Sequence, residues 1–319
     1  MSEPAPVPPS RGALDAVAAM RTEIGKAVVG QDAVVDQVLC AFLAGGNVLV
    51  EGVPGLGKTL LVLALARTFG GHFARIQFTP DLMPSDVTGH AMLDPSGQVR
   101  IRQGPAFTNL LLADEINRAP AKTQAALLEV MQERQITIEG RSYPVPQPFM
   151  ALATQNPIEH EGTYPLPEAQ LDRFAVQLAM GYPPEEEEIE VLGMLDERSP
   201  LDALQPVASL EDVLEAQTRV RRVPVHVDVR RYVVALLAAS RKEPRLALGV
   251  SPRGGIALYR LAQAQALVSG RSAVIPDDVK AVAVMTLAHR VVLETKARYS
   301  GVTKEQVIKD LLQRVPVPV

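Results

Sequence analysis

The nine residues EGVPGLGKT, at positions 51–59, constrain the fold of this chain more than any other stretch. They match the pattern G-x-x-x-x-G-K-[ST] with Gly52, Gly57, Lys58 and Thr59. The apolar residues before them predict a short buried strand, and LLVLALART after them predicts a helix. A glycine-rich turn between a strand and a helix N-terminus directs backbone N–H groups at a phosphate chain. We therefore expect a nucleotide-phosphate site in an α/β fold; a glycine-rich turn without a ligand is the alternative.

Two residues of this loop have distinct expected roles. The Lys58 ammonium should reach the β- and γ-phosphates, and the Thr59 hydroxyl should ligate Mg²⁺, so ATP and Mg²⁺ are the expected ligands. The candidate nucleotide contacts are Gly52, Val53, Pro54, Gly55, Leu56, Gly57, Lys58, Thr59 and Leu60.

A second apolar run ends in two adjacent carboxylates. LLLADEIN, at positions 110–117, reads as a buried strand followed by Asp114 and Glu115. Two neighbouring like charges at a buried strand end are costly unless a cation or a reaction needs them. Asp114 is therefore a candidate Mg²⁺ ligand, and Glu115 is a candidate general base for an attacking water. Two exposed loop carboxylates are the alternative.

The rest of the chain predicts an α/β domain followed by helices. Residues 1–12 are rich in Pro and Ser and read as a disordered tail. Four further strands are expected at 73–78, 110–115, 149–154 and 174–180, and their alternation with helices indicates a mostly parallel sheet. This places an α/β domain at 13–182, with hairpin inserts at about 89–104 and 135–146, and a helical domain at 183–319.

Composition narrows the function classes. The chain has 319 residues, a net charge of −4 and 4% aromatic residues, which gives no sign of direct nucleic-acid binding. Cys40 is the only cysteine, and the five histidines show no metal-ligand spacing. Neither a secretory leader nor an apolar run long enough for membrane insertion is evident, so a cytoplasmic location is expected.

Longer motifs carry a resemblance to a known family. QFTPDLMPSDVTG, GPAFTNLLLADEINRAPAKTQAALLEVMQE, ALATQNPIEHEGTYPLPEAQLDRF and SPRGGIALYRLAQA together resemble the MoxR family of AAA+ ATPases. The resemblance covers nearly the whole chain after the tail. It implies a P-loop NTPase core, a C-terminal all-α lid and assembly into a homo-oligomeric ring, usually a hexamer. The two hairpins resemble inserts that face a ring's pore or upper face, so they are candidate client contacts; surface hairpins without a role are the alternative.

Three positions take roles from this resemblance in the α/β domain. Asn156 resembles sensor 1, which orients the lytic water or touches the γ-phosphate; a turn-forming Asn is the alternative. Val29, after Val28, resembles the adenine-pocket segment, with a plain core role as the alternative. Arg118 could approach a neighbouring nucleotide or make a helix-start contact, and the residues leave this open.

Two arginines are implied to act on phosphate. Arg173 resembles the arginine finger that points at a neighbour's nucleotide; an ion pair with Asp172 or Glu168 is the alternative. Arg253 resembles sensor 2 of the lid. Ser251 should cap the N-terminus of a helix whose first turn contains Arg253. A cation in this first turn opposes the helix dipole unless an anion is bound there.

The resemblance implies a Mg²⁺-dependent ATPase that remodels or matures protein partners, often with von Willebrand factor A domain proteins and in metal-cofactor insertion. A magnesium-chelatase-like or nucleic-acid motor subunit is one alternative. A slow, nucleotide-gated scaffold is another. The client and the pathway are not encoded in any motif of this chain.

Overall fold

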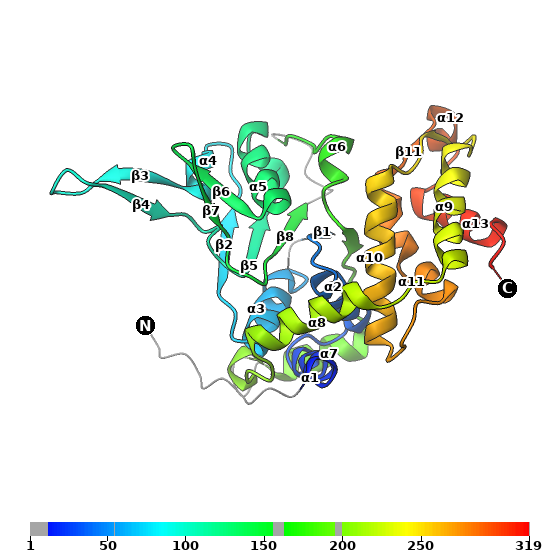
Figure 1. Cartoon of the computed structure of the whole chain (residues 1–319), viewed down its shortest axis with the longest axis horizontal. Coiled ribbons are helices and arrows are strands. Elements are labelled where there is room, and N and C mark those ends of the chain that lie inside the picture. The colour runs from blue at the N-terminus through cyan, green and yellow to red at the C-terminus, as the bar shows by residue number, and fades with distance from the viewer. Residues whose placement is uncertain (1–11, 54, 156–162, 195–199, 319) are drawn as a thin grey trace.

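The structure is a computed structural model, and it describes residues 12–53, 55–155, 163–194 and 200–318. An α/β domain holds the central sheet, and a helical lid lies beside it (Figure 1). A long hairpin extends from the α/β domain on the side away from the lid (Figure 1).

The central sheet has five strands in the order β2-β5-β8-β1-β9, and every pair is parallel. This confirms the parallel α/β sheet expected from the sequence. Parallel strands place their carboxyl ends on one edge, where the loops that bind ligands converge. The strands are β1 (Val48–Glu51), β2 (Phe73–Gln77), β5 (Leu110–Asp114), β8 (Met150–Gln155) and β9 (Val176–Ala179).

Alternate strand residues pack into two separate apolar clusters. Val48, Val50 and Leu112 belong to one cluster, whereas Leu49 and Leu111 belong to the other. Successive side chains of a strand point to opposite faces, so both faces of the sheet are buried by helices. Helices α1 (Ala13–Gly25), α2 (Asp32–Leu43), α3 (Lys58–Thr68) and α5 (Ala121–Glu133) belong to this domain. Cys40 is buried in the first cluster, where burial raises the pKa of its thiol to about 12.

Both expected hairpins are present. The first pairs β3 (Gly89–Leu93) with β4 (Val99–Gln103) and follows the short helix α4 (Pro84–Thr88). The second pairs β6 (Gln135–Ile138) with β7 (Arg141–Pro144). Its two-residue turn places Glu139 and Gly140 at φ 48° and 73°, as a type I′ turn requires.

The lid is predominantly helical, as expected, but it also holds a short antiparallel ladder of β10 (Leu246–Leu248) and β11 (Val292–Leu293). The expectation of helices alone after Met180 was wrong here, because strands of two or three residues leave no alternating pattern. The boundary near residue 182 stays a prediction. The helices that follow β9 in the sequence are α7 (Glu185–Met194), α8 (Leu210–Arg222), α9 (Val227–Arg241), α10 (Pro252–Val268), α11 (Pro276–Leu287), α12 (Thr295–Tyr299) and α13 (Lys304–Arg314). The short α6 (Glu168–Leu171) precedes β9, and 3-10 turns lie at Ile116–Arg118, Pro200–Ala203 and Ala288–Arg290.

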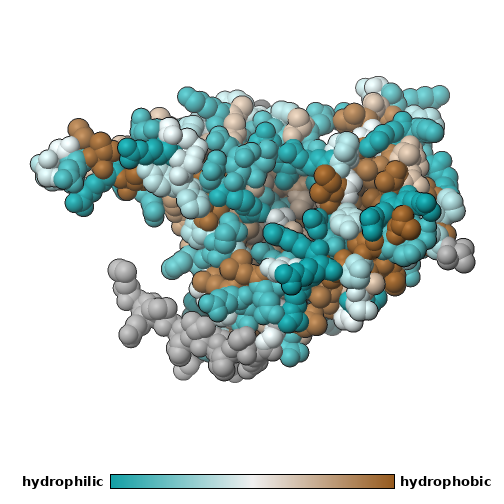
Figure 2. Space-filling view, in the orientation of Figure 1, coloured by the Kyte–Doolittle hydropathy of each residue, from teal (hydrophilic) through white to brown (hydrophobic). Residues whose placement is uncertain are grey.

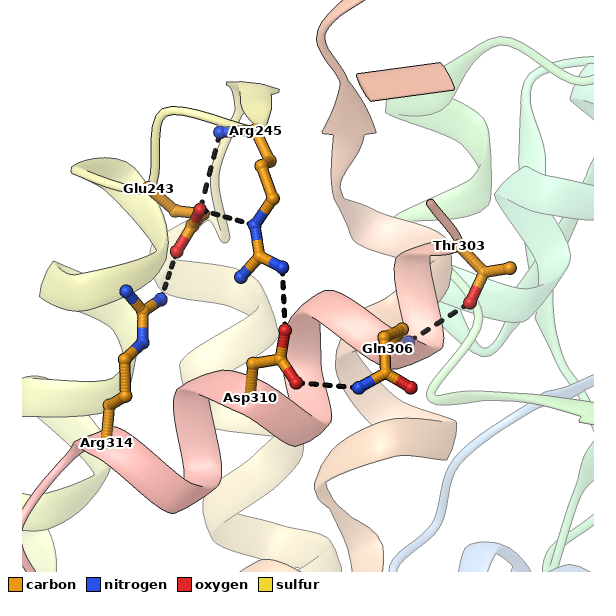
Figure 3. Close-up of polar contacts among 6 residues, drawn as sticks. All are labelled: Glu243, Arg245, Thr303, Gln306, Asp310 and Arg314. Carbon is orange, nitrogen blue, oxygen red and sulfur yellow. Dashed lines mark hydrogen bonds and ion pairs between the residues drawn. The ribbon is translucent and has the colours of Figure 1, made fainter. Parts of the chain in front are cut away.

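An ionic network attaches the last helix to the lid (Figure 3). Glu243, which follows α9, accepts hydrogen bonds from Arg245 at 2.7 Å and from Arg314 of α13. Arg245 also donates to Asp310 of α13 at 2.6 Å. We call this group the α13 clasp. Its central carboxylate is buried, with a side chain only 2% exposed.

In the part of the chain that the structure describes, no helix is long and apolar enough to cross a membrane.

Candidate functional site

A cavity of about 410 Å³ lies at the carboxyl edge of the sheet, where the loop after β1 meets the ends of β2, β5 and β8. Its lining combines backbone of the glycine-rich loop with polar side chains. The residues are Gly52, Gly55, Gly57, Lys58, Thr59, Leu60, Arg75, Gln77, Asp114, Glu115 and Thr154. The two motifs that the sequence analysis singled out are therefore brought together.

The glycine-rich loop has the backbone that the pattern predicts. Gly55 and Gly57 have φ values of 90° and 84°, which side-chain-bearing residues rarely adopt. A Cβ on Gly52 would lie 2.8 Å from the Met180 carbonyl oxygen, so only glycine fits between this loop and β9. Helix α3 then starts at Lys58, and Lys58, Thr59 and Leu60 of its first turn line the cavity.

Lys58 lies in this loop with its ammonium donating to the Gly52 carbonyl. Burial lowers the pKa of Lys58, and the charges of Asp114, Glu115 and Glu51 partly offset that effect. A cation held beside a glycine-rich loop at the start of a helix suits a polyanionic ligand.

Asp114 ends β5 with both carboxylate oxygens engaged. Arg75 of β2 lies 2.7 Å from one oxygen, and the Thr154 hydroxyl donates to the other at 2.6 Å. Thr154 also accepts a hydrogen bond from the Glu115 backbone N–H at 2.8 Å. Thr154 of β8 therefore fixes the relative positions of the two acidic residues.

Glu115 has a φ of 55°, in the left-handed region that non-glycine residues seldom occupy. Its carboxylate accepts hydrogen bonds from Gln77 at 2.7 Å and from Arg118 at 2.9 Å. Arg118, which the sequence left open, thus contacts Glu115 of its own chain. Backbone strain at a polar residue in a cavity is typical of functional sites.

The donor set fits a magnesium ion bound together with phosphate. The hydroxyl of Thr59 and the carboxylate of Asp114 are hard oxygen donors that line the same cavity. Magnesium in nucleotide sites usually takes one or two protein ligands and completes its shell with phosphate oxygens and water. Within the described ranges, no group of three or more His, Cys, Asp or Glu side chains could hold a metal ion.

A second cavity, also about 410 Å³, lies at the opposite, amino edge of the sheet and reaches helix α10 of the lid. Asn47 and Ala175, which precede β1 and β9, line it together with Arg253. Its polar lining is mostly cationic, with one acidic residue. The charged residues are Arg134, Arg173, Arg253, Arg260, Arg290 and Asp172. We call this the arginine cavity.

The arginines of this cavity differ in their partners. Arg290 forms an ion pair with Asp172 at 2.8 Å, and Arg134 donates to two backbone carbonyls. Burial lowers the pKa of Arg134 to about 10, with the nearby charge of Arg221 as the smaller cause. Among the described residues, Arg173 and Arg253 form neither a hydrogen bond nor an ion pair with any side chain.

In the described structure Arg173 therefore has no ion pair with Asp172 or Glu168. Asp172 forms its ion pair with Arg290 instead. Arg253 occupies the first turn of α10, after Ser251, whose hydroxyl accepts from the Gly254 N–H. This is the cap that the sequence predicts. Both arginines lie at the amino edge of the sheet, opposite the edge that holds the first cavity.

Val29 does not line either of these cavities, and Val28 is buried in the first apolar cluster. The chain next to Val29 contacts the segment after β9: Gln31 donates to the Gly181 carbonyl at 3.0 Å, and Gly30 lies against Pro183. Pro54 and Asn156 lie outside the described residues.

Reasoning from the sequence missed three residues of the first cavity, namely Arg75, Gln77 and Thr154. Arg75 and Gln77 alternate on β2, where Gln77 is the last residue, and Thr154 is the last but one residue of β8; both strands neighbour β5. Polar residues near the carboxyl ends of predicted strands were the available signal.

Comparison with known proteins agrees with this arrangement. Residues 47–176 match the family model "ATPase family associated with various cellular activities (AAA)", and residues 238–311 match the AAA lid domain. The chain is 46% identical to YeaC of Bacillus subtilis, an uncharacterized protein, over 93% of each chain. It is 45% identical to chaperone MoxR1 of Mycobacterium tuberculosis, over 93% of this chain and 81% of that one.

Two further relatives extend the pattern. Protein MoxR of Methylorubrum extorquens is 33% identical over 94% of each chain. A crystal structure of a candidate ATPase from Cytophaga hutchinsonii is 40% identical and superposes with a TM-score of 0.90 over 96% of each chain. With its AAA core, its AAA lid and these relatives, the chain belongs to the MoxR family of AAA+ ATPases.

Proposed function

We propose that this MoxR-type AAA+ protein hydrolyses ATP with Mg²⁺ at sites shared between neighbouring subunits of a ring, and that turnover remodels or matures partner proteins. The observation that carries the proposal is the separation of the two cavities. The phosphate loop and the acidic pair lie at one edge of the sheet. At the other edge lie Arg173 and Arg253, which have no side-chain partner among the residues that the structure describes.

The unpaired arginines support a shared site because they cannot serve the phosphate loop of their own chain from the opposite edge of the sheet. An accessible guanidinium without a counter-charge is suited to bind phosphate oxygens of another molecule. If copies of the chain pack so that one copy's arginine cavity covers the next copy's phosphate loop, each nucleotide meets both sets of groups. Repetition of this heterologous contact closes a ring when the rotation allows it. A hexamer is the ring we propose.

In the proposed reaction, Lys58 and the loop N–H groups hold the β- and γ-phosphates in position. Glu115 polarises the attacking water, and Arg173 of the neighbouring copy stabilises charge that develops on the γ-phosphoryl oxygens. Thr59 and Asp114 would hold Mg²⁺, which neutralises phosphate charge when bound. Gln77 and Arg118, which both contact the Glu115 carboxylate, would hold it in place.

Mixing inactive variants tests the shared site. Lys58→Ala lacks the phosphate loop cation, and Arg173→Ala lacks the finger, so each should be inactive alone. In a mixed ring some intact loops face an intact Arg173, and part of the activity should return. Assembly of each variant is measured first by light scattering. Two results together would contradict the shared site. The mixed rings form but stay inactive, and rings of either variant with wild-type chains keep activity in proportion to their wild-type content.

The same experiment assigns Arg253. Arg253→Ala mixed with Lys58→Ala should also regain activity, because the missing arginine is supplied by the other chain. Arg253→Ala mixed with Arg173→Ala should not, because each subunit surface lacks one arginine of the pair. Recovery in that second mixture would show that Arg253 acts on its own chain's nucleotide.

The β3–β4 hairpin is the proposed contact with partner proteins. Near its tip, Leu93 and Val99 face each other in the ladder and are 67% and 69% exposed, and Met92 is 48% exposed. Figure 2 shows apolar surface on the protrusion, close behind its polar end. Exposed apolar residues of this kind mark interaction sites. A protein with a von Willebrand factor A domain is the partner that we propose, in the cytoplasm, with metal-cofactor insertion as one use.

A tip variant, Leu93→Ser with Val99→Ser, should keep the basal ATPase rate and lose the change in rate that a partner causes. Its matched control is Thr137→Ser in the shorter hairpin, at an exposed position that faces Ser142 in that ladder. Lower basal turnover in the tip variant would indicate a role within the ring and contradict a client-contact role.

A further inference from the structure

Arg290 is a buried lid residue that reaches into the α/β domain. It ends the 3-10 turn after α11 and is 5% exposed. Its guanidinium donates to the Asp172 carboxylate at 2.8 Å, to the Ala175 carbonyl at 3.0 Å, and to the carbonyl of Phe174. These acceptors lie on both sides of Arg173, so the segment that carries Arg173 is tied to the lid before and after it.

Asp172 joins the same segment to a second lid element. Its other carboxylate oxygen accepts a hydrogen bond from the Ser251 hydroxyl at 3.0 Å. The same hydroxyl accepts from the Gly254 N–H at 3.2 Å and so caps helix α10. The carboxylate of Asp172 therefore contacts both the turn that carries Arg290 and the turn that carries Arg253.

The two glycines after Arg253 show how closely these parts pack. A Cβ on Gly254 would lie 2.8 Å from Cδ of Arg290, and a Cβ on Gly255 would lie 2.5 Å from a methyl of Leu237. The absence of a side chain at position 254 leaves the space through which the Arg290 stem passes, between the Arg253 turn and the Arg173 segment.

The charges of this contact favour a single arrangement. Burial lowers the pKa of Arg290, and the hydrogen bond and charge of Asp172 act against that effect. The neighbouring His289 is buried as well, and burial lowers its pKa far below the ordinary value, so it adds no second cation. A buried guanidinium needs acceptors at the fixed positions of its five N–H groups, and a displaced segment would leave it unpaired.

We propose that Arg290 is a positioning residue that holds the Asp172–Ala175 segment and the first turn of α10 in one arrangement, so that Arg173 and Arg253 meet the same phosphate group together. The proposal rests on the proposed role of Arg173 at a neighbour's nucleotide. Arg290 belongs to the lid and is 117 positions from Arg173 in the sequence. Through Arg290 the lid would set the position of Arg173.

Arg290→Lys tests this, because lysine keeps the charge and loses the planar set of donors. The matched control is Arg245→Lys in the α13 clasp, which removes a comparable set of lid contacts without touching the Arg173 segment. Arg290→Lys should assemble and keep its KM for ATP within about threefold, but its kcat should fall about 10- to 100-fold, the effect of a displacement near 1 Å. Arg245→Lys should keep its kcat. An Arg290→Lys kcat within about twofold of wild type would overturn the proposal.

Mixing shows on which nucleotide Arg290 acts. Arg290→Lys mixed with Lys58→Ala should regain activity, because its intact loop faces an intact finger. Mixed with Arg173→Ala it should gain no activity above the reduced rate of Arg290→Lys alone, because neither chain supplies a correctly placed finger. Recovery in the second mixture would place the defect in the variant's own nucleotide site and overturn the proposal.

Amide hydrogen exchange separates this inference from the proposed function. The amides of residues 172–175 are protected by hydrogen bonds to Glu168, Gln170, Leu171 and Asn47. They should exchange faster in Arg290→Lys than in wild type or Arg245→Lys. Unchanged exchange would overturn the positioning role whatever Arg173 does. Failure of Arg173→Ala and Lys58→Ala to complement each other would instead overturn the finger role alone.

Discussion

The α13 clasp makes the stability of the lid depend on pH through Glu243 (Figure 3). Hydrogen bonds from Arg245 and then from Arg314 lower the pKa of Glu243 from 4.5 to about 2, against the opposing effect of burial. We consider the replacement Glu243→Gln, which keeps the shape of the side chain and removes its charge. The variant should unfold more readily than wild type at neutral pH.

The magnitude follows from the two pKa values. A folded value of about 2 against 4.5 unfolded corresponds to about 3 kcal/mol at pH 7. The Arg314 side chain is 57% exposed, so solvent screening reduces this to about 2 kcal/mol. For a domain of roughly 150 to 250 residues, a loss of about 2 kcal/mol lowers the melting temperature by about 4 to 8 °C.

The sign of the pH dependence follows from the lowered folded pKa. Well above pH 4.5 the carboxylate is ionised in both states, and the folded state keeps its full advantage. As pH falls toward 2 the unfolded state binds a proton first, so the advantage decreases and then disappears. The difference in melting temperature between wild type and Glu243→Gln should therefore be largest near pH 7 and shrink by about half at pH 3.5.

Circular dichroism melts of both proteins at the two pH values measure this. Glu215→Gln is the matched control, because Glu215 pairs with Arg219 on the surface, where the side chains are 46% and 45% exposed. Such a pair contributes at most about 0.5 kcal/mol. The reasoning is refuted if Glu243→Gln melts within about 1 °C of wild type at pH 7, or if the difference is the same at both pH values.

Three further outcomes are expected. Glu115→Gln should bind ATP with unchanged affinity by calorimetry and release phosphate about 10²- to 10⁴-fold more slowly; normal release would exclude Glu115 as the base. Thr154→Val should lower kcat more than KM, because Thr154 contacts both Asp114 and the Glu115 N–H; an unchanged kcat would show that this contact is dispensable. Gly104→Ala should destabilise the protein in urea, because its Cβ would lie 2.4 Å from the Gly89 nitrogen, whereas Gly25→Ala, with open space around it, should not; equal midpoints would contradict the close packing.

Local features of the sequence determined the family, the parallel sheet and the position of the nucleotide loop. The loop at 51–59 and the Asp114–Glu115 pair can each be recognised from a stretch of about ten residues. Glycines, an apolar run and the charges at the end of that run act on the backbone of the same stretch. The cap of α10 by Ser251 was predictable for the same reason.

The partners of the charged groups were decided by the tertiary structure. Asp172 lies beside Arg173 in the sequence, yet it pairs with Arg290, and Arg173 and Arg253 share a cavity although they are 80 positions apart. Thr154 joins the two acidic residues from another strand. Which cation a carboxylate takes depends on what packing buries beside it, since an unpaired buried charge is far more costly than an exposed one. That depends on the three-dimensional path of the whole chain, and no local pattern records it.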